Sequence, residues 1–445
     1  MIMLRWLALL VLVVILAPRP VPPVHGNPPP VPLAAPQLGP WIDVWMGMDD
    51  KHNYVEDVAY NHRHDEYLVL WTTAQGTDTT DLWARRVGAG GSVRSWFNVA
   101  TNPAHVVSTA RAAYSPVQDH YLVVFVYQYS SADWDIYAII VPGDGTAPSG
   151  LWIPISKDTD FQSEPAIVYN DKTDEFLVAW SNGRNLTGPN PEWTVQMQRR
   201  RASDGTPDGG IYIVPGGGMG VARSGPAVAY NRVRDQYLIA YIVEAAAPGD
   251  VGSIAASADL AQFGAERHVW DHTPQWHAFD ALVGASGDGY LVAWNVSHLS
   301  PPPPSAALQN GYARHVSGAG VPLGTLSGIP ITAATHPFDI RRVSDAAYAP
   351  GYGYLMGLGY AQSTGAESDT YAAFILPGAA TAGAPFAIDV AATHAWGPVA
   401  ACAPRGVCLL AETYRLNAPW SKSDIRARFL YLQRVYLPAT LRAAG

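Results

Sequence analysis

One short pattern recurs along this chain and limits what it can fold into. VEDVAYNHRHDEYLVLW at 55–71 returns as ARAAYSPVQDHYLVVF at 110–125, EPAIVYNDKTDEFLVAW at 164–180 and GPAVAYNRVRDQYLIAY at 225–241. Weaker copies follow at 279–294, 344–360 and 397–414. The anchor position, Tyr60 in the first copy and Cys402 in the last, recurs about every 57 residues. This period, filled with short apolar runs, predicts radially repeated β-sheets rather than a helical solenoid.

Each copy predicts four strands. Two apolar strands joined by a tight turn come first, and the third strand begins at an aspartate, as at Asp81 and Asp135. A Gly/Pro turn then leads to the fourth strand. The last copy ends after its third strand, whereas PWIDVWM at 40–46 is similar to the fourth strand PFAIDVA at 385–391. We therefore predict an all-β, seven-bladed β-propeller over residues 41–445, with four-stranded antiparallel blades, closed by the N-terminal strand.

The two cysteines of the chain, Cys402 and Cys408, lie in the last copy. They occupy the two positions that hold an aromatic pair in earlier copies, such as Tyr60 and Tyr67. With PRG at 404–406 as a three-residue hairpin loop, the cysteines become directly opposed across two strands, about 4.5 Å apart at Cα. This geometry predicts a structural disulfide in an oxidising compartment, because the spacing matches no catalytic or zinc motif.

The N-terminus predicts export. A short basic segment precedes the apolar run Trp6–Ala17, which is too short to span a bilayer and is followed by Val24 and Gly26 as a small-residue cleavage candidate. We interpret residues 1–26 as a signal peptide, with an uncleaved anchor as the alternative. Residues 27–40 are rich in proline and predict an extended linker. We expect a secreted or cell-envelope protein with no transmembrane segment after cleavage.

Composition excludes one class of partner. The chain is 48% hydrophobic and 15% charged, with a formal net charge of −9. Removing residues 1–26 takes away Arg5 and Arg19 and leaves a charge of −11. Such an acidic chain is poorly suited to bind nucleic acid. We expect a monomer that uses no cofactor.

The predicted strand directions sort the loops onto two faces. The turns between first and second strands are tight and share one face, while the second-to-third loops and the connections between blades share the other. This other face, the long-loop face, carries the insertions at 181–192 and 295–309. Insertions that gather on one face of a repeat protein indicate the binding face, with Pro-rich excursions of no function as the alternative.

Charged and aromatic residues also gather where the long-loop face meets the mouth of the central channel. The charged candidates are Glu56, Asp57, Arg111, Glu164, Asp280 and Asp345; the ring-bearing candidates are Trp134, Trp193, Trp276, Trp396, Trp420, His277 and His394. Aromatic rings stack on sugars while carboxylates accept hydrogen bonds from hydroxyl groups, and the same residue types form protein hot spots. These residues predict a site for a glycan or a protein, with packing between blades as the alternative for each ring.

Some of the candidate acids would also suit catalysis. Glu56 or Asp57 with Glu164 or Asp280 would serve as acid and base on a glycosidic bond if the carboxyls lay about 5–10 Å apart. The sequence lacks sialidase Asp boxes and any G-x-S-x-G motif. Its histidines form no H-x-H or H-E-x-x-H pattern, so no metal site is predicted. We predict a non-catalytic binder, with a carbohydrate-active hydrolase or lyase as the alternative.

The repeat resembles that of secreted bacterial β-propellers whose blades read P-A-V-A-Y-N … D-E-Y-L-V-V-W … D-I-Y-A-x-R-V. The resemblance covers residues 41–436 and is clearest in GPAVAYNRVRDQYLIAY. The fifth and seventh copies depart from it at the anchor, with Val283 and Cys402. The resemblance implies a propeller fold and an extracellular address, and it carries no catalytic residues to this chain.

Overall fold

The computed structural model describes most of the chain as β-strand. The described residues are 36–47, 51–75, 79–102, 105–130, 133–184, 192–215, 221–244, 249–271, 276–287, 289–298, 309–331, 339–362, 368–390, 394–415 and 423–432. Within these ranges there is no helix, as the predicted all-β class requires, and so none long and apolar enough to cross a membrane. The predicted signal peptide, Trp420 and most of both long insertions lie outside the described residues.

The strands follow one another along the chain with short connections. They are β1 (Gln37–Trp45), β2 (His52–Asn61), β3 (Glu66–Gln75), β4 (Thr79–Gly88), β5 (Val93–Ala100), β6 (Val106–Ser115), β7 (His120–Gln128), β8 (Trp134–Pro142), β9 (Ile153–Ser156), β10 (Phe161–Asn170), β11 (Glu175–Arg184), β12 (Glu192–Arg201), β13 (Tyr212–Ile213), β14 (Ala222–Asn231), β15 (Gln236–Glu244), β16 (Asp250–Ser257), β17 (Arg267–Trp270), β18 (Trp276–Ser286), β19 (Gly289–His298), β20 (Gln309–Ser317), β21 (Ile329–Pro330), β22 (Asp339–Ala349), β23 (Gly353–Gln362), β24 (Ser368–Ile375), β25 (Phe386–Asp389), β26 (His394–Ala403), β27 (Val407–Arg415) and β28 (Asp424–Tyr431).

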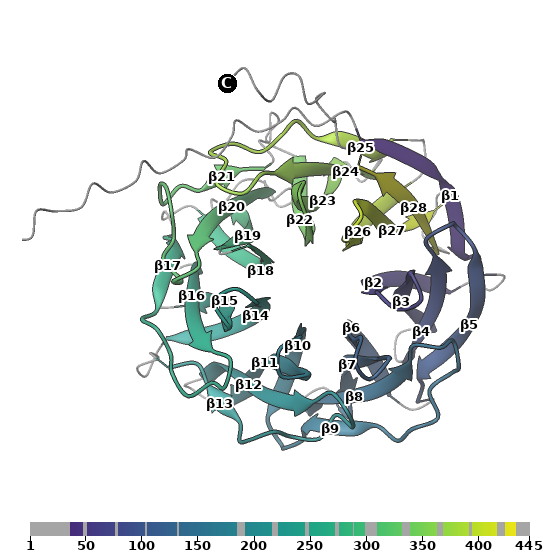
Figure 1. Cartoon of the computed structure of the whole chain (residues 1–445), viewed down its shortest axis with the longest axis horizontal. Coiled ribbons are helices and arrows are strands. Elements are labelled where there is room, and N and C mark those ends of the chain that lie inside the picture. Colours follow the sequence, from purple (N-terminus) through teal and green to yellow (C-terminus); the bar gives the residue numbers. More distant parts are fainter. Residues whose placement is uncertain are drawn as a thin grey trace, which may run out of the picture. The chain divides into compact units, whose positions relative to one another are not determined.

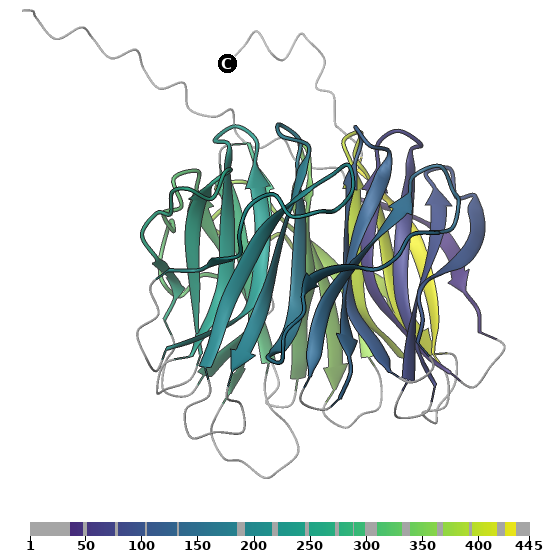
Figure 2. The same cartoon turned by 90° about the horizontal axis from the view of Figure 1, so that it is seen from below.

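One unit, an antiparallel meander of four strands, is repeated along the chain. The meanders are β2–β5, β6–β9, β10–β13, β14–β17, β18–β21 and β22–β25, and β26, β27 and β28 are completed by β1. The first strand of each meander contacts the first strand of the next, and β26 contacts β2. Figure 1 shows these first strands innermost and the fourth strands outermost, and Figure 2 shows the strands running between two faces. The fold is therefore β-propeller-like.

The polar letters of the repeat specify the turn between first and second strands. The Asn61 side chain accepts hydrogen bonds from the backbone N–H groups of Arg63 (2.9 Å) and His64 (3.0 Å). Asp65 ends this turn with a φ of 52°, a left-handed conformation that aspartate tolerates better than most residues. Tyr60 donates its hydroxyl proton to Asp65 over 2.8 Å. The arrangement recurs at Asp119, Asp174 and Asp235, which accept from Tyr114, Tyr169 and Tyr230.

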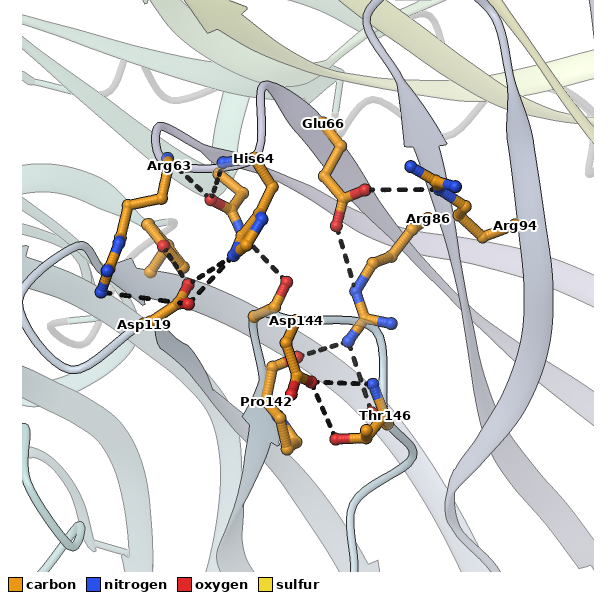
Figure 3. Close-up of polar contacts among 12 residues, drawn as sticks. Arg63, His64, Glu66, Arg86, Arg94, Asp119, Pro142, Asp144 and Thr146 are labelled. Atoms are coloured by element: carbon orange, nitrogen blue, oxygen red, sulfur yellow. Dashed lines mark hydrogen bonds and ion pairs between the residues drawn. The ribbon is translucent and has the colours of Figure 1, made fainter.

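The same four aspartates also bind the preceding meander. His64 Nε2 lies 2.9 Å from Asp119 Oδ2, Gln118 donates to Asp174 over 2.6 Å, Lys172 Nζ lies 3.7 Å from Asp235, and Arg405 pairs with Asp65. Figure 3 shows the link at Asp119, with Arg63 on the same carboxylate and the buried pair Glu66–Arg86 beside it. We call the four aspartates with these donors the turn clasp. It joins successive meanders on the tight-turn face.

The N-terminal strand completes the last meander by pairing with β28. It begins at Gln37, inside the range 27–40 that composition predicts to be a linker. Pro40 is tolerated in this strand because β1 is an outer strand with a bulge between Leu38 and Trp41, so no ladder hydrogen bond is required of the proline. Proline content alone therefore places the start of the folded part too late.

Arginines on three third strands hold the outer strands in place. Each guanidinium donates both to its own outer segment and to the outer strand of the preceding meander: Arg85 to the carbonyls of Arg94 and Val44, Arg314 to those of Leu323 and Val269, and Arg428 to those of Gly39 and Ile388. Two of these acceptors, Val44 and Gly39, belong to β1. The arginines therefore help to fix the strand that completes the last meander.

The predicted disulfide is present. Cys402 and Cys408 lie directly opposite each other on β26 and β27 and are bonded, with their Cα atoms 4.0 Å apart. The loop between them, 404–406, contains Gly406 at a φ of 83°, a left-handed conformation that suits glycine. The covalent bond takes the place of the aromatic pair that joins the same two strands in other meanders.

One anchor assignment from the sequence is wrong. In β18 the position that corresponds to Tyr60 belongs to Ala285, which lies opposite Tyr290, whereas Val283 pairs with Val292. The error arises because the turn after β18 spans two residues, 287–288, instead of the four residues 62–65 of the first copy. A shorter turn moves the anchor two residues toward the turn.

Candidate functional site

Every first strand bulges at the same place, a few residues after its start. Five residues before the anchor, five of these strands have a residue with positive φ: Thr109, Glu164, Gly225, Asp280 and Gly397. A left-handed conformation costs a residue other than glycine about 1–2 kcal/mol. Strain of this kind concentrates at functional sites, so the bulges indicate where a candidate site lies.

The bulges line a cavity of about 780 Å³. Its charged lining residues are Asp57, Arg111, Glu164, Asp280, Arg342 and Asp345, its ring-bearing ones are Tyr360 and Trp396, and small and aliphatic side chains fill the rest of the wall. A cavity of this volume accommodates a small organic ligand. The structure thus brings together four of the five acids predicted from the sequence, the predicted arginine and one predicted tryptophan.

Three of the cavity carboxylates bind the neighbouring first strand. Asp57 accepts a hydrogen bond from the backbone N–H of Ala112 (2.7 Å), and Asp345 accepts one from that of Ala400 (2.6 Å). Glu164 accepts from the N–H of Gly225 over 2.9 Å. Each of these carboxylates therefore joins two neighbouring meanders.

Burial raises the pKa of three of the cavity acids. Burial raises the pKa of Asp57 to about 7, and the nearby Asp345 adds to the rise while Arg111 opposes it. The pKa of Asp345 is raised mainly by burial as well. Burial raises the pKa of Asp280, although Arg342 opposes the rise. Near neutral pH the cavity therefore holds fewer negative charges than its number of carboxyl groups suggests.

The two guanidinium groups of the cavity are partly engaged with the protein. Arg111 donates through Nη1 to the carbonyls of Glu56 and Ala110, each over 2.8 Å. The guanidinium of Arg342 lies 5.0 Å from the ring centroid of Phe279. The Glu56 carboxylate does not line the cavity; it accepts a hydrogen bond from Thr72 (2.8 Å), and burial raises its pKa.

Trp396 is the predicted tryptophan that reaches the cavity. The guanidinium of Arg415 lies 4.9 Å from its ring centroid, and the ring of Tyr54 lies 6.5 Å away at a tilt. Trp396 is only partly buried. The indole is therefore held by neighbours while it still contributes to the cavity wall.

The other described ring candidates do not line this cavity. Trp134 stacks on Phe161 at 4.5 Å, and Trp193 meets the same ring edge-on at 5.7 Å, so these two pack where adjacent meanders meet. Trp276 packs against a buried apolar cluster, and His277 lies 3.8 Å from Glu244. His394 begins β26 opposite Arg415. Their ring chemistry alone does not distinguish packing from ligand contact.

The polar lining residues that the sequence analysis did not name include Thr109, Arg342 and Tyr360. Counting five residues back from the anchor finds Thr109 directly, and Arg342 lies one residue further back. This rule works only where the anchor residue is assigned correctly. The wrong assignment of Val283 shows that the sequence alone does not ensure a correct anchor. Tyr360 lies on the second strand β23, so no first-strand pattern reveals it.

Comparison with known proteins supports the fold. No family model and no curated protein matches the chain. The solved structure of a protein of unknown function from Dyadobacter fermentans DSM 18053 is 8% identical, with a TM-score of 0.53 over 89% of this chain and 99% of that one. The polysaccharide lyase Uly1 is also 8% identical, with a TM-score of 0.55 over 89% of this chain and 100% of Uly1. At such identities the likeness concerns the β-propeller-like fold alone.

Proposed function

We propose that this chain is an exported, monomeric, closed seven-bladed β-propeller that binds an extracellular glycan without catalysis. The binding site is the central cavity on the long-loop face. One observation carries the proposal: a single cavity combines carboxylates and guanidinium groups with the rings of Tyr360 and Trp396. Sugars are recognised by this combination, because rings cover their apolar faces while charged groups exchange hydrogen bonds with their hydroxyls.

The seven-bladed reading rests on the pairing of the strands. β1 supplies the outer strand of the meander β26–β28, and β26 contacts β2. The turn clasp crosses the same junction through Arg405 and Asp65. A closed ring of this kind leaves no long sheet edge unprotected at the junction of the two ends of the fold.

Binding without catalysis is favoured because three cavity carboxylates already accept hydrogen bonds from the protein backbone. Asp57, Glu164 and Asp345 each accept a backbone hydrogen bond from the next first strand. A general acid or base has to exchange a proton with its substrate during the reaction. A carboxylate that holds two strands together is poorly placed for such an exchange.

A carbohydrate-active hydrolase or lyase is the second candidate, and one observation favours it. Burial raises the pKa of Asp57 to about 7 and also raises that of Asp280. A carboxyl group that stays protonated near neutral pH can donate its proton to a leaving group. The structure brings both residues to one cavity, as two-carboxylate catalysis requires.

The test is binding of purified residues 27–445 to a broad glycan and polysaccharide array. Trp396→Ala should lower the affinity for a bound glycan at least about tenfold, because it removes the ring from the cavity wall. Trp96→Ala is the matched control, since Trp96 is exposed on β5 and does not line the cavity. Absence of binding to every glycan, or equal losses in both variants, would contradict the proposal.

The array also separates the two candidates. Any glycan that binds is incubated with the protein, and its products are examined for new reducing ends or unsaturated sugars. If cleavage products form with the unchanged protein and do not form with Asp57→Asn, the result would support the carbohydrate-active enzyme and contradict the non-catalytic binder. An array without binding would direct the search to a protein ligand in the envelope of the producing organism.

A further inference from the structure

One position of the first strands divides the mouth of the cavity into two sides. It lies six residues before the anchor, with Ala285 as the anchor of β18, and its residue is paired with the second strand close to the bulge. Three first strands have serine at this position, and the others have an aromatic ring or a guanidinium. The serines are Ser108, Ser163 and Ser224, and the larger side chains belong to Phe279, Arg342, Trp396 and Tyr54.

The strands that have the larger side chains are neighbours. β18 contacts β22, β22 contacts β26, and β26 contacts β2. Figure 1 shows them following one another along one side of the inner ring of strands, with β6, β10 and β14 along the other side. We call Phe279, Arg342, Trp396 and Tyr54 the mouth arc. Two of its members, Arg342 and Trp396, line the cavity, so the arc belongs to the rim of the proposed binding site.

The opposite side of the mouth offers hydrogen bonds, with serine in place of a ring at this position. Ser163 is only 9% exposed. The carboxylate of Glu164, the next residue, accepts hydrogen bonds from the Ser181 hydroxyl (2.7 Å) and from the backbone N–H of Gly225 (2.9 Å). A sugar that reaches this side can exchange hydrogen bonds there, whereas the mouth arc offers a stacking partner to the apolar face of a sugar.

The two rings of the arc that lie next to each other, Trp396 and Tyr54, are held in place by neighbours. The guanidinium of Arg415 lies 4.9 Å from the ring centroid of Trp396, and its Nη2 lies 3.2 Å from His52 Nδ1. The ring of His52 in turn stacks on that of Tyr54, with centroids 6.3 Å apart. Rings that are already ordered lose little conformational entropy on binding, so more of the stacking energy contributes to affinity.

Tyr54 extends the arc beyond the cavity. Trp396 lines the cavity, and Tyr54 does not. Tyr54 is 37% exposed, and its ring centroid lies 6.5 Å from that of Trp396. This spacing is close to the length of one sugar unit in an extended chain. Two successive units of one chain can therefore each meet a ring.

We propose that the mouth arc binds an oligosaccharide chain where the chain leaves the cavity, with Tyr54 as a subsite outside the cavity wall. This subsite rests on the proposed glycan function and adds the class of its ligand, a chain that extends past the cavity rather than a single sugar enclosed by it. Within the cavity the exposed guanidinium of Arg342 donates to sugar hydroxyls, and the chain then passes Trp396 and stacks on Tyr54. Affinity should therefore depend on the length of the chain.

Binding of residues 27–445 is measured with oligosaccharide ladders prepared from cellulose, xylan, chitin and alginate, each running from disaccharide to octasaccharide. Within a ladder that binds, the affinity of the unchanged protein should rise with length and level off once the chain covers Tyr54. Tyr54→Ala should lower the affinity for the octasaccharide at least about fivefold and leave that for the shortest bound fragment unchanged. Trp396→Ala should lower both affinities, because Trp396 lines the cavity.

Two further variants separate stacking from other effects of the substitution. Tyr54→Phe keeps the ring and should bind the octasaccharide within about twofold of the unchanged protein. Tyr129→Ala is the matched control, because Tyr129 is also 37% exposed but belongs to a meander that has Ser108 at the arc position. Tyr129 does not line the cavity, so this variant should leave the affinity at every length unchanged.

Three outcomes would overturn the chain-binding subsite while leaving glycan binding intact. They are an affinity that does not depend on chain length, a loss in Tyr54→Ala that is equal at every length, and octasaccharide affinities that Tyr54→Ala and Tyr129→Ala reduce to the same extent. Binding to none of the ladders would also overturn the subsite, and the glycan array would then decide whether glycan binding fails as well.

Discussion

The turn clasp and the cavity both place acids in left-handed backbone positions, yet they treat the acids in opposite ways. At Asp119 burial acts to raise the pKa, but hydrogen bonds from Tyr114 and His64 and the charge of Arg63 outweigh it and lower the pKa. In the cavity, burial prevails at Asp280, which is left-handed like Asp119, and raises its pKa; at the neighbouring Asp57 burial raises the pKa to about 7. The turn clasp therefore stabilises the ionised form of its carboxylate, whereas the cavity destabilises the ionised form of its carboxyl groups.

The difference shows what each region demands of the sequence. Each of the four carboxylates of the turn clasp belongs to an aspartate at the end of a four-residue turn. Aspartate tolerates the left-handed backbone of that turn, and its carboxylate accepts both from the tyrosine of its own meander and from a donor of the preceding one. The bulge position of the cavity holds threonine, glutamate, glycine or aspartate in the same left-handed conformation. Side chains that vary over a constant backbone are what a recognition surface requires.

The largest expected effect is a dependence of stability on pH. Asp57 has a folded pKa of about 7 against an ordinary value of 3.8, so its stabilising contribution is complete at low pH and is lost as the pH rises through 7. We expect the free energy of unfolding to fall by up to about 4 kcal/mol between about pH 4 and about pH 8. Denaturant titrations across this range measure it.

Asp57→Asn is the informative variant for that titration. It removes one of the titrating groups, so the fall in unfolding free energy above about pH 5 should be smaller than in the unchanged protein, while Glu412, whose pKa burial raises to about 8, continues to contribute. Asp119→Asn should leave this fall unchanged, because the pKa of Asp119 is lowered and its contribution is lost only as the pH decreases. Identical pH profiles for Asp57→Asn and the unchanged protein would contradict the difference between the two regions.

Removing a clasp aspartate comes next in size. Asp119→Ala deletes the acceptor of Tyr114 and His64 and places alanine at a φ of 56°, so the free energy of unfolding should fall by about 2–3 kcal/mol. Asp280→Gly in the cavity should leave stability unchanged or raise it slightly, because glycine relieves the φ of 52° there. Chemical denaturation compares the two; equal losses would show that both regions are structural.

The disulfide contributes a smaller amount. Replacing Cys402 and Cys408 together by alanine should lower the free energy of unfolding by about 2 kcal/mol, because the closed loop is short. Glycan affinity should stay unchanged, since the hairpin does not line the cavity. Melting curves with and without a reducing agent test the same point in the unchanged protein, where reduction should reproduce the loss.

The smallest effect is expected at the junction of the last and first meanders. Arg405 and Asp65 are 46% and 43% exposed, and exposed ion pairs stabilise a protein by about 0–1 kcal/mol. Arg405→Ala should therefore lower the unfolding free energy by less than about 1 kcal/mol, and the loss should shrink at high salt. A larger loss would mean that this link governs the junction of the meanders.

Local patterns made much of the site predictable. The sequence pattern along each strand shows alternating apolar residues, turn-forming residues and regularly spaced aspartates. These local features predicted the four-stranded units and the group Asp57, Glu164 and Asp280. Trp134 and Trp193 could not be assigned in this way, because an indole between two meanders and an indole facing a ligand have the same composition. Only the position of Phe161 between them distinguishes the cases.

The sequence by itself determined the repeat, the turn chemistry and the pairing of Cys402 with Cys408, because each depends on residues a few positions apart. The tertiary structure alone decided which charges share the cavity and that Arg342 and Tyr360 join them. These contacts join strands that are distant along the chain. Their register depends on turn lengths and bulges, which shift by single residues without leaving a mark in the periodic pattern.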